Sequence, residues 1–138
     1  MIRHMVMWKL RGETAAEQQA ARQMVKAAFE GLLGRVPGLL SMEVGSDESG
    51  VDYACDVVMI AYFIDAQALT AYATHYDHLR VRHELGDLRT LRYQVDYPSA
   101  ERPPINDSMK AARHETDPHP LLPGSARHRS HRQRLFAQ

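Results

Sequence analysis

Segments with the residue spacing of strands and segments with the spacing of helices follow one another in a fixed order along the first hundred residues. Strands show apolar side chains at every second position or as one continuous apolar run, whereas helices show them three and four residues apart. The order is strand, helix, strand, strand, helix, strand. The segments are expected at residues 2–10 (strand), 14–34 (helix), 40–45 (strand), 53–63 (strand), 66–74 with a continuation at 79–85 (helix) and 90–97 (strand).

This order is that of the ferredoxin-like split βαβ arrangement, βαββαβ. It predicts an α+β fold with a four-stranded antiparallel sheet and both helices on one face. The first helix has an S/T-x-x-E capping box, Thr14 with Glu17, at its start and Pro37-Gly38 beyond its end.

The first strand is apolar on both of its faces. Its one face carries Val6 and Trp8, and its other face carries Met5 and Met7. Helices on one side of the sheet leave the second face bare, and an apolar patch of that size is unusual on a monomer. A second copy of the chain covers such a face most simply, so the sequence predicts a homodimer.

The last forty residues differ in composition from the rest. Residues 99–138 contain five of the seven prolines and a basic cluster at 127–134, and they have few large apolar groups. We therefore expect a folded domain at 1–98 and an extension at 99–138 that is disordered or draped on a partner. The basic cluster lacks stacking aromatic residues, which argues against a nucleic-acid partner.

Bulk charge and cysteine content restrict the class of protein further. Lys and Arg together number 17, as do Asp and Glu, so no overall field points to nucleic acid or a membrane. The single cysteine, Cys55, cannot form an internal disulfide, which is typical of a reducing compartment. No segment resembles a signal peptide or a membrane span. The expectation is a cytoplasmic protein without a membrane partner.

Five short segments, taken in order, resemble the stress-responsive dimeric α/β-barrel (Dabb) family. They are HMVMWK at residues 4–9, VPGL at 36–39, EVG at 43–45, the ALTAYATHYDH segment at 68–78 and VDY at 95–97. Each is short, but their order is specific, and together they cover residues 1 to about 98. The resemblance implies a dimeric α/β barrel with a cavity between the sheet and the helices of each subunit.

The resemblance also suggests functional residues. Some plant relatives are polyketide cyclases that use a Tyr and a His in this cavity, and these match Tyr72 and His78. A first-strand His and a helix-segment His of that cavity match His4 and His75. These residues make Tyr72 and His78 the candidate catalytic pair.

Two positions depart from the cyclase pattern. Tyr76 replaces the proline that follows the first histidine of the helix segment, and Phe29 replaces a tyrosine of the first helix. Trp8 and Phe29 complete the predicted ligand-binding set together with His4 and His75. No cofactor and no metal ion are expected.

A histidine with a pKa near neutrality can take a proton from a carbon acid while a tyrosine donates a hydrogen bond to the resulting oxyanion. His78 and Tyr72 fit these roles, but buried polar groups can equally satisfy each other or the backbone. A metal site at His75 and His78, with His4 or Asp77, is a weaker alternative because no metal-binding motif reinforces it.

Three functional hypotheses follow. The leading one is a Dabb-type homodimer that binds a hydrophobic, oxygenated small molecule in its cavity. The alternative is a cofactor-independent enzyme, similar to a polyketide cyclase or an isomerase, with His78 as general base. The third is a structural stress protein with a filled, dry interior.

Overall fold

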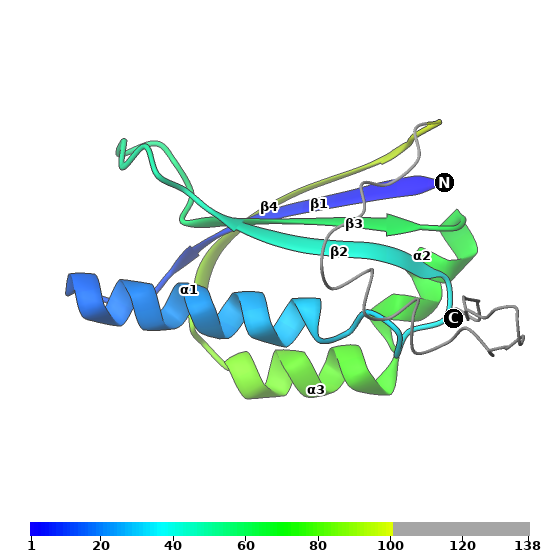
Figure 1. The fold of residues 1–138 in the computed structure, drawn as a ribbon, viewed down its shortest axis with the longest axis horizontal. Helices are drawn as coiled ribbons and strands as arrows, with labels where there is room; N and C mark the ends of the chain where they lie inside the picture. The colour runs from blue at the N-terminus through cyan, green and yellow to red at the C-terminus, as the bar shows by residue number, and fades with distance from the viewer. Residues whose placement is uncertain (101–138) are drawn as a thin grey trace, which may run out of the picture.

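The computed structural model describes residues 1–100, and these form one antiparallel sheet with every helix on the same side (Figure 1). The strand order β2-β3-β1-β4 is that of a ferredoxin-like fold, which confirms the predicted fold class. The predicted extension at 99–138 lies almost entirely outside the described residues. The elements are β1 (Ile2–Leu10), α1 (Ala15–Glu30), β2 (Leu39–Ser46), β3 (Val57–Phe63), α2 (Ala66–Ala73), α3 (Tyr76–Leu85) and β4 (Arg89–Pro98).

Helix α1 begins where the capping box predicts and ends four residues early. The Thr14 hydroxyl accepts a hydrogen bond from the Glu17 backbone N–H, and the Glu17 carboxylate accepts one from the Thr14 N–H. The expected end at residue 34 is wrong, because the helix stops at Glu30 and the chain continues in tight turns to Val36. Gly34 in these turns has a φ of 88°, which a helix cannot contain.

The turn at Gly38 brings the start of β2 against α2. A Cβ atom at Gly38 would lie 2.5 Å from the Cβ atom of Ala68, and its φ is 81°. The Gly38 carbonyl also accepts a hydrogen bond from the Ile64 N–H at 2.9 Å. Only glycine fits this position, so the VPGL segment fixes where α2 lies on the sheet.

Strand β2 contains a register irregularity that the alternation did not predict. The pairing with β3 shifts between Leu39 and Ser41, so Leu39 joins Met42 and Val44 in the core. Leu40, which the pattern placed on the buried face, is only half-buried. One extra residue in a strand turns the following side chains to the other face.

Strand β3 is shorter than predicted at its beginning. It starts at Val57 rather than Tyr53, and the Tyr53 side chain is 87% exposed in the β2–β3 connection. The Asp56 carboxylate holds the start of the strand, because it accepts hydrogen bonds from the Leu10 N–H at 2.7 Å and from the Arg22 guanidinium at 3.2 Å. Cys55, expected in the buried strand, is half-buried in the connection.

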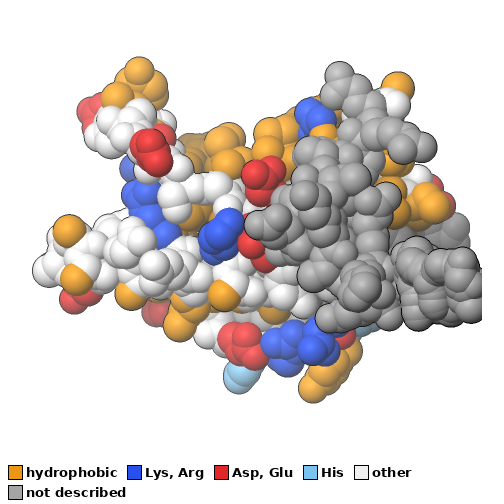
Figure 2. Space-filling model, in the orientation of Figure 1, with side chains coloured by type: hydrophobic (Ala, Val, Ile, Leu, Met, Phe, Trp, Pro, Cys, Tyr) orange, Lys and Arg blue, Asp and Glu red, His pale blue; other side chains and the backbone are white. Residues whose placement is uncertain are grey.

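This connection rises on the side of the sheet away from the helices, and hydrophobic side chains gather at its tip (Figures 1 and 2). Val51 and Tyr53 are its exposed large apolar residues.

The two faces of the sheet have different surroundings. The face toward the helices holds one buried core, and its β1 and β3 members are Val6, Trp8, Leu10, Val57, Met59, Ala61 and Phe63. We call the opposite side the outer sheet face. Residues directly opposite each other in neighbouring strands share a face. The register gives its apolar and aromatic members as Met5, Met7, Val58, Ile60, Tyr62, Leu91, Tyr93, Val95 and Tyr97.

Within residues 1–100, no helix has both the length and the apolar character that crossing a membrane requires.

Candidate functional site

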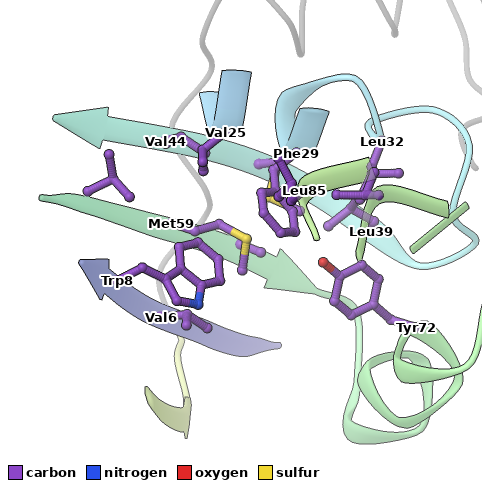
Figure 3. Close-up of a cluster of buried hydrophobic side chains, with 14 of the residues drawn as sticks. Val6, Trp8, Val25, Phe29, Leu32, Leu39, Val44, Met59, Tyr72 and Leu85 are labelled. Carbon is purple, nitrogen blue, oxygen red and sulfur yellow. The ribbon is translucent and has the colours of Figure 1, made fainter. Parts of the chain in front are cut away.

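Tyr72 is the one buried residue of helix α2, and only 3% of it is exposed. Its hydroxyl points into the hydrophobic core, toward the cluster that contains Met59 and Phe29 (Figure 3). No group within the described residues forms a hydrogen bond with this hydroxyl. Burial raises the pKa of Tyr72 far above its usual value, although the charges of Arg89 and Arg92 act to lower it. The hydroxyl therefore keeps its proton and is a hydrogen-bond donor.

Three aromatic rings surround Tyr72. The imidazole of His78 stacks on the phenol ring with 4.1 Å between the ring centroids and 29° between the ring planes. The ring of Phe63 lies 5.0 Å away and that of His4 lies 6.1 Å away. The structure thus brings together three of the residues that the sequence singled out, Tyr72, His78 and His4.

His78 is oriented by the end of helix α2. Its Nδ1 atom lies 3.2 Å from the carbonyl oxygen of Ala73, and because a carbonyl can only accept, Nδ1 carries the proton and donates. The lone pair of a neutral His78 is therefore on Nε2. Burial lowers the pKa of His78, the bond to Ala73 raises it, and the charges of Arg82 and Arg89 lower it further. The net shift is downward, which keeps the ring neutral near pH 7.

His75 has a different environment from His78. Its Nδ1 atom accepts a hydrogen bond of 3.1 Å from the Asp77 backbone N–H and so caps the first turn of α3. The cap lets helix α3 begin at Tyr76, three residues before the position that the sequence indicated. The departure from the family proline at Tyr76 leaves this side chain 75% exposed on the helix. His75 therefore has a structural role, and its predicted contact with a ligand stays a prediction.

A line of hydrogen-bonded side chains connects buried His4 to the surface along β4. The Nδ1 atom of His4 lies 2.5 Å from Oδ1 of Asp96, whose other oxygen accepts a hydrogen bond of 3.0 Å from the Gln94 amide. The Gln94 carbonyl oxygen in turn accepts from the Arg92 guanidinium. His4 is 4% exposed whereas Asp96, Gln94 and Arg92 are exposed, so the line links one buried imidazole beside Tyr72 to the surface. The bond to Asp96 fixes the orientation of the His4 ring and engages its Nδ1 atom.

Trp8 and Phe29, the other predicted ligand-binding residues, pack against each other. Their rings stack with centroids 5.1 Å apart, and both side chains are buried, at 3% and 1% exposed. The guanidinium carbon of Arg89 lies 4.9 Å from the centroid of the Trp8 ring and 5.5 Å from that of Phe29. The two residues form an apolar wall with a cation over it.

A metal centre is not assembled in this region. Across residues 1–100, no group of three or more His, Cys, Asp or Glu side chains is arranged to hold a metal ion. At the alternative site, the Nδ1 lone pair of His75 accepts the hydrogen bond from the Asp77 N–H, so it is not open to a metal ion.

Sequence reasoning missed Asp96, Gln94, Arg92 and Arg89. The alternation in residues 90–97 put the first three on one strand face, but it did not say which strand lies beside them. Only the pairing of β1 with β4 places Asp96 opposite His4. Arg89 lies beyond a register shift, so the period-two pattern could not assign it to a face.

Comparison with known proteins gives the family. A family model described as the stress responsive A/B barrel domain (Dabb) matches residues 2–99. Comparison with curated proteins found no match.

Several solved structures have the same fold. A dimeric protein of unknown function with a ferredoxin-like fold from Bacteroides fragilis NCTC 9343 is 25% identical, with 70% of this chain and 93% of that chain covered and a TM-score of 0.62. A dimeric ferredoxin-like protein of unknown function from Jannaschia sp. CCS1 is 24% identical, with coverages of 71% and 98% and a TM-score of 0.58. A cofactor-independent oxygenase from Streptomyces nogalater is 18% identical, with coverages of 75% and 97% and a TM-score of 0.51.

The family match spans most of the chain and agrees with the strand order, the VPGL turn and the segment that carries Tyr72 and His78. The chain belongs to the stress-responsive A/B barrel domain (Dabb) family.

Proposed function

We propose that this protein is a homodimer that binds a hydrophobic, oxygenated small molecule on the helix side of its sheet, at Tyr72, His78 and His4. The observation that carries the proposal is the Tyr72 hydroxyl, which is buried without a hydrogen-bond partner among the described residues. Leaving a buried hydroxyl unsatisfied costs about 1–3 kcal/mol. An oxygen atom of a bound molecule offsets that cost, and the surrounding aromatic rings suit the apolar part of the same molecule.

The outer sheet face supports the homodimer. Met7, Tyr93 and Val95 on this face are 43%, 55% and 55% exposed, and they lie side by side across the pairing of β1 and β4. The charged Arg3 on the same face donates a hydrogen bond to the Tyr97 hydroxyl and lies over the Tyr97 ring, so its side chain packs against the aromatic part of this face. Two copies that pair through these faces would cover the apolar patch in each subunit, and the protein of the same fold from Bacteroides fragilis is described as dimeric.

The binding proposal is tested with two ligands of one scaffold, 1-naphthol and naphthalene. We expect the wild type to bind 1-naphthol more tightly, and Tyr72→Phe to weaken 1-naphthol about fivefold to tenfold while naphthalene is unchanged. Tyr76→Phe makes the same chemical change at an exposed position on α3 and is the matched control. Isothermal titration calorimetry measures the affinities of the three proteins for the two ligands. Equal effects on both ligands would contradict the role of the Tyr72 hydroxyl. No binding of either ligand would contradict the proposal and favour a filled, dry interior.

A second function, cofactor-independent proton-transfer catalysis, is favoured by the geometry of His78. Its Nδ1 atom is engaged with Ala73, which leaves the Nε2 lone pair to take a proton from a carbon next to a carbonyl group. Tyr72, which keeps its proton, can donate a hydrogen bond to the enolate oxygen that forms. A cofactor-independent oxygenase shares the fold.

The catalytic proposal is tested by exchange of the methyl protons of 1-acetonaphthone in heavy water, followed by proton NMR. His78 would remove a proton from the methyl carbon and return a deuteron from the solvent to the same carbon. We expect His78→Gln to slow the catalysed exchange about 100-fold or more and to leave the affinity for 1-acetonaphthone unchanged. His83→Gln, on the exposed side of the same helix, should exchange like the wild type. Unchanged exchange in His78→Gln would reject catalysis without affecting the binding proposal.

A further inference from the structure

Arg89, the first residue of β4, holds a positive charge over the apolar wall of the candidate site. Its guanidinium lies 4.9 Å from the Trp8 ring and 5.5 Å from the Phe29 ring, as measured to the centroids. Both rings belong to the buried core on the helix side of the sheet. The register with β1 puts Arg89 opposite Leu10, whose side chain is also on that face.

Among residues 1–100, no acid lies close enough to Arg89 to form an ion pair. Other arginines form ion pairs, Arg22 with Asp56 at 3.2 Å and Arg80 with Glu84 at 2.9 Å. Over the described part of the chain, no ion pair to Arg89 exists. Burial lowers the pKa of Arg89, and the charges of Arg92 and Arg82 lower it further. A partly buried cation among other cations is unfavourable unless something negative accompanies it.

The same charges act on the candidate binding residues. Arg89 and Arg92 oppose the effect of burial on the pKa of Tyr72, and Arg82 and Arg89 lower the pKa of His78. Tyr72 and His78 therefore lie in the positive field of these guanidiniums. A hydroxyl donor without a partner and a guanidinium without a counter-charge both require acceptor oxygen atoms, and the guanidinium prefers a negative group with two of them.

We propose that the molecule bound at this site is a hydrophobic carboxylate and that Arg89 binds its carboxylate group. A guanidinium presents paired N–H donors that match the two oxygens of a carboxylate. The stacked rings of Trp8 and Phe29 restrict the orientation of the guanidinium, which reduces the entropy lost on binding. The alternative to this proposal is that Arg89 only covers the two aromatic rings and binds no ligand. The inference rests on the proposed binding function and adds the charge of the ligand to it.

The test compares 1-naphthoate with 1-naphthamide, a neutral molecule of nearly the same shape, by isothermal titration calorimetry at pH 7.5. The wild-type protein should bind 1-naphthoate at least about tenfold more tightly than 1-naphthamide. Arg89→Gln should abolish that preference and leave the affinity for 1-naphthamide within about twofold. Arg89→Lys keeps the charge without the paired donors and should retain part of the preference.

Arg35→Gln is the matched control because it removes one positive charge from an exposed turn and should keep the full preference. Circular dichroism melting checks that each variant is folded. If Arg89→Gln does not fold, the comparison is made with Arg89→Lys alone. A preference that persists in Arg89→Gln, or in Arg89→Lys at its full size when only that variant folds, would overturn the inference. The proposed function would then still stand if 1-naphthol binds. Failure of 1-naphthol, 1-naphthoate and 1-naphthamide to bind the wild type would overturn both.

Discussion

The two faces of the sheet are built from alternate residues of the same strands, but they differ in how far their apolar side chains are buried. On the helix side, Val6 and Phe63 are fully buried within the chain. On the outer sheet face, Tyr93 and Val95 are each 55% exposed although they are as apolar as many core residues. Within residues 1–100, the helix side is thus covered by the chain itself, whereas the outer sheet face stays exposed, and we propose that a second copy covers it. Neighbouring residues of a strand point to opposite faces, so one residue contributes to the folded core and the next to the proposed contact between copies.

The largest effect is expected on the helix side. Phe63→Ala removes a fully buried ring that contacts Tyr72, and we expect it to lower the free energy of unfolding by about 3–5 kcal/mol. Urea denaturation followed by circular dichroism measures this loss. Tyr93→Ala on the outer sheet face is the comparison, and in dilute protein it should cost much less. Equal losses in the two variants would contradict the division between the faces.

A charge on the outer sheet face should separate the copies without unfolding them. Val95 lies directly opposite Met5 and is largely exposed within one chain, so Val95→Asp costs the folded subunit little. In a dimer the same carboxylate would be moved from water into the contact between two apolar faces, and we expect association to weaken by about 2 kcal/mol or more, at least roughly 30-fold in the dissociation constant. Sedimentation equilibrium measures it, with Gln23→Asp on the exposed side of α1 as control. A wild type that is monomeric at micromolar concentration would reject the dimer.

The smallest effect is a pH dependence that comes from the helix side. Burial lowers the pKa of His78 in the folded state, so the unfolded chain takes up a proton at a higher pH than the folded one. The stability is therefore complete above the unfolded pKa of about 6.5 and falls as the pH drops from there to the folded pKa. We expect His78→Gln to lose less stability than the wild type between pH 8 and pH 5.5 in urea denaturation. His83→Gln should show the same pH dependence of stability as the wild type. If His78→Gln also shows it, His78 is not the group responsible.

The order of elements could be predicted because each helix or strand repeats its apolar residues at its own spacing, and that spacing is visible in the local sequence. Irregularities within the strands could not be predicted. The shift at Leu39–Ser41 and the late start of β3 at Val57 depend on which strand lies alongside. Asp56 shows this most clearly, since its carboxylate bonds a residue 46 positions earlier in the chain, Leu10.

The candidate site divides in the same way. Tyr72 and His78 lie within one short segment, so the resemblance to the family could point to both. Strand pairing places Asp96 at the site, and a contact with the Trp8 ring places Arg89 there. The local sequence around these two residues does not indicate either position. The resemblance also could not show that His75 caps a helix, because a cap depends on backbone geometry.

The methionines offer the most direct test, since Met59 lies beside Trp8 in the core that the Tyr72 hydroxyl points into (Figure 3) and Met5 and Met7 lie on the outer sheet face. With ¹³C-methyl methionine, ring currents of bound 1-naphthol report which face the ligand occupies. We expect titration with 1-naphthol to shift the Met59 methyl signal and to leave those of Met5 and Met7 in place. Shifts at Met5 and Met7 with an unchanged Met59 signal would show that the ligand binds the outer sheet face, and would contradict a helix-side site.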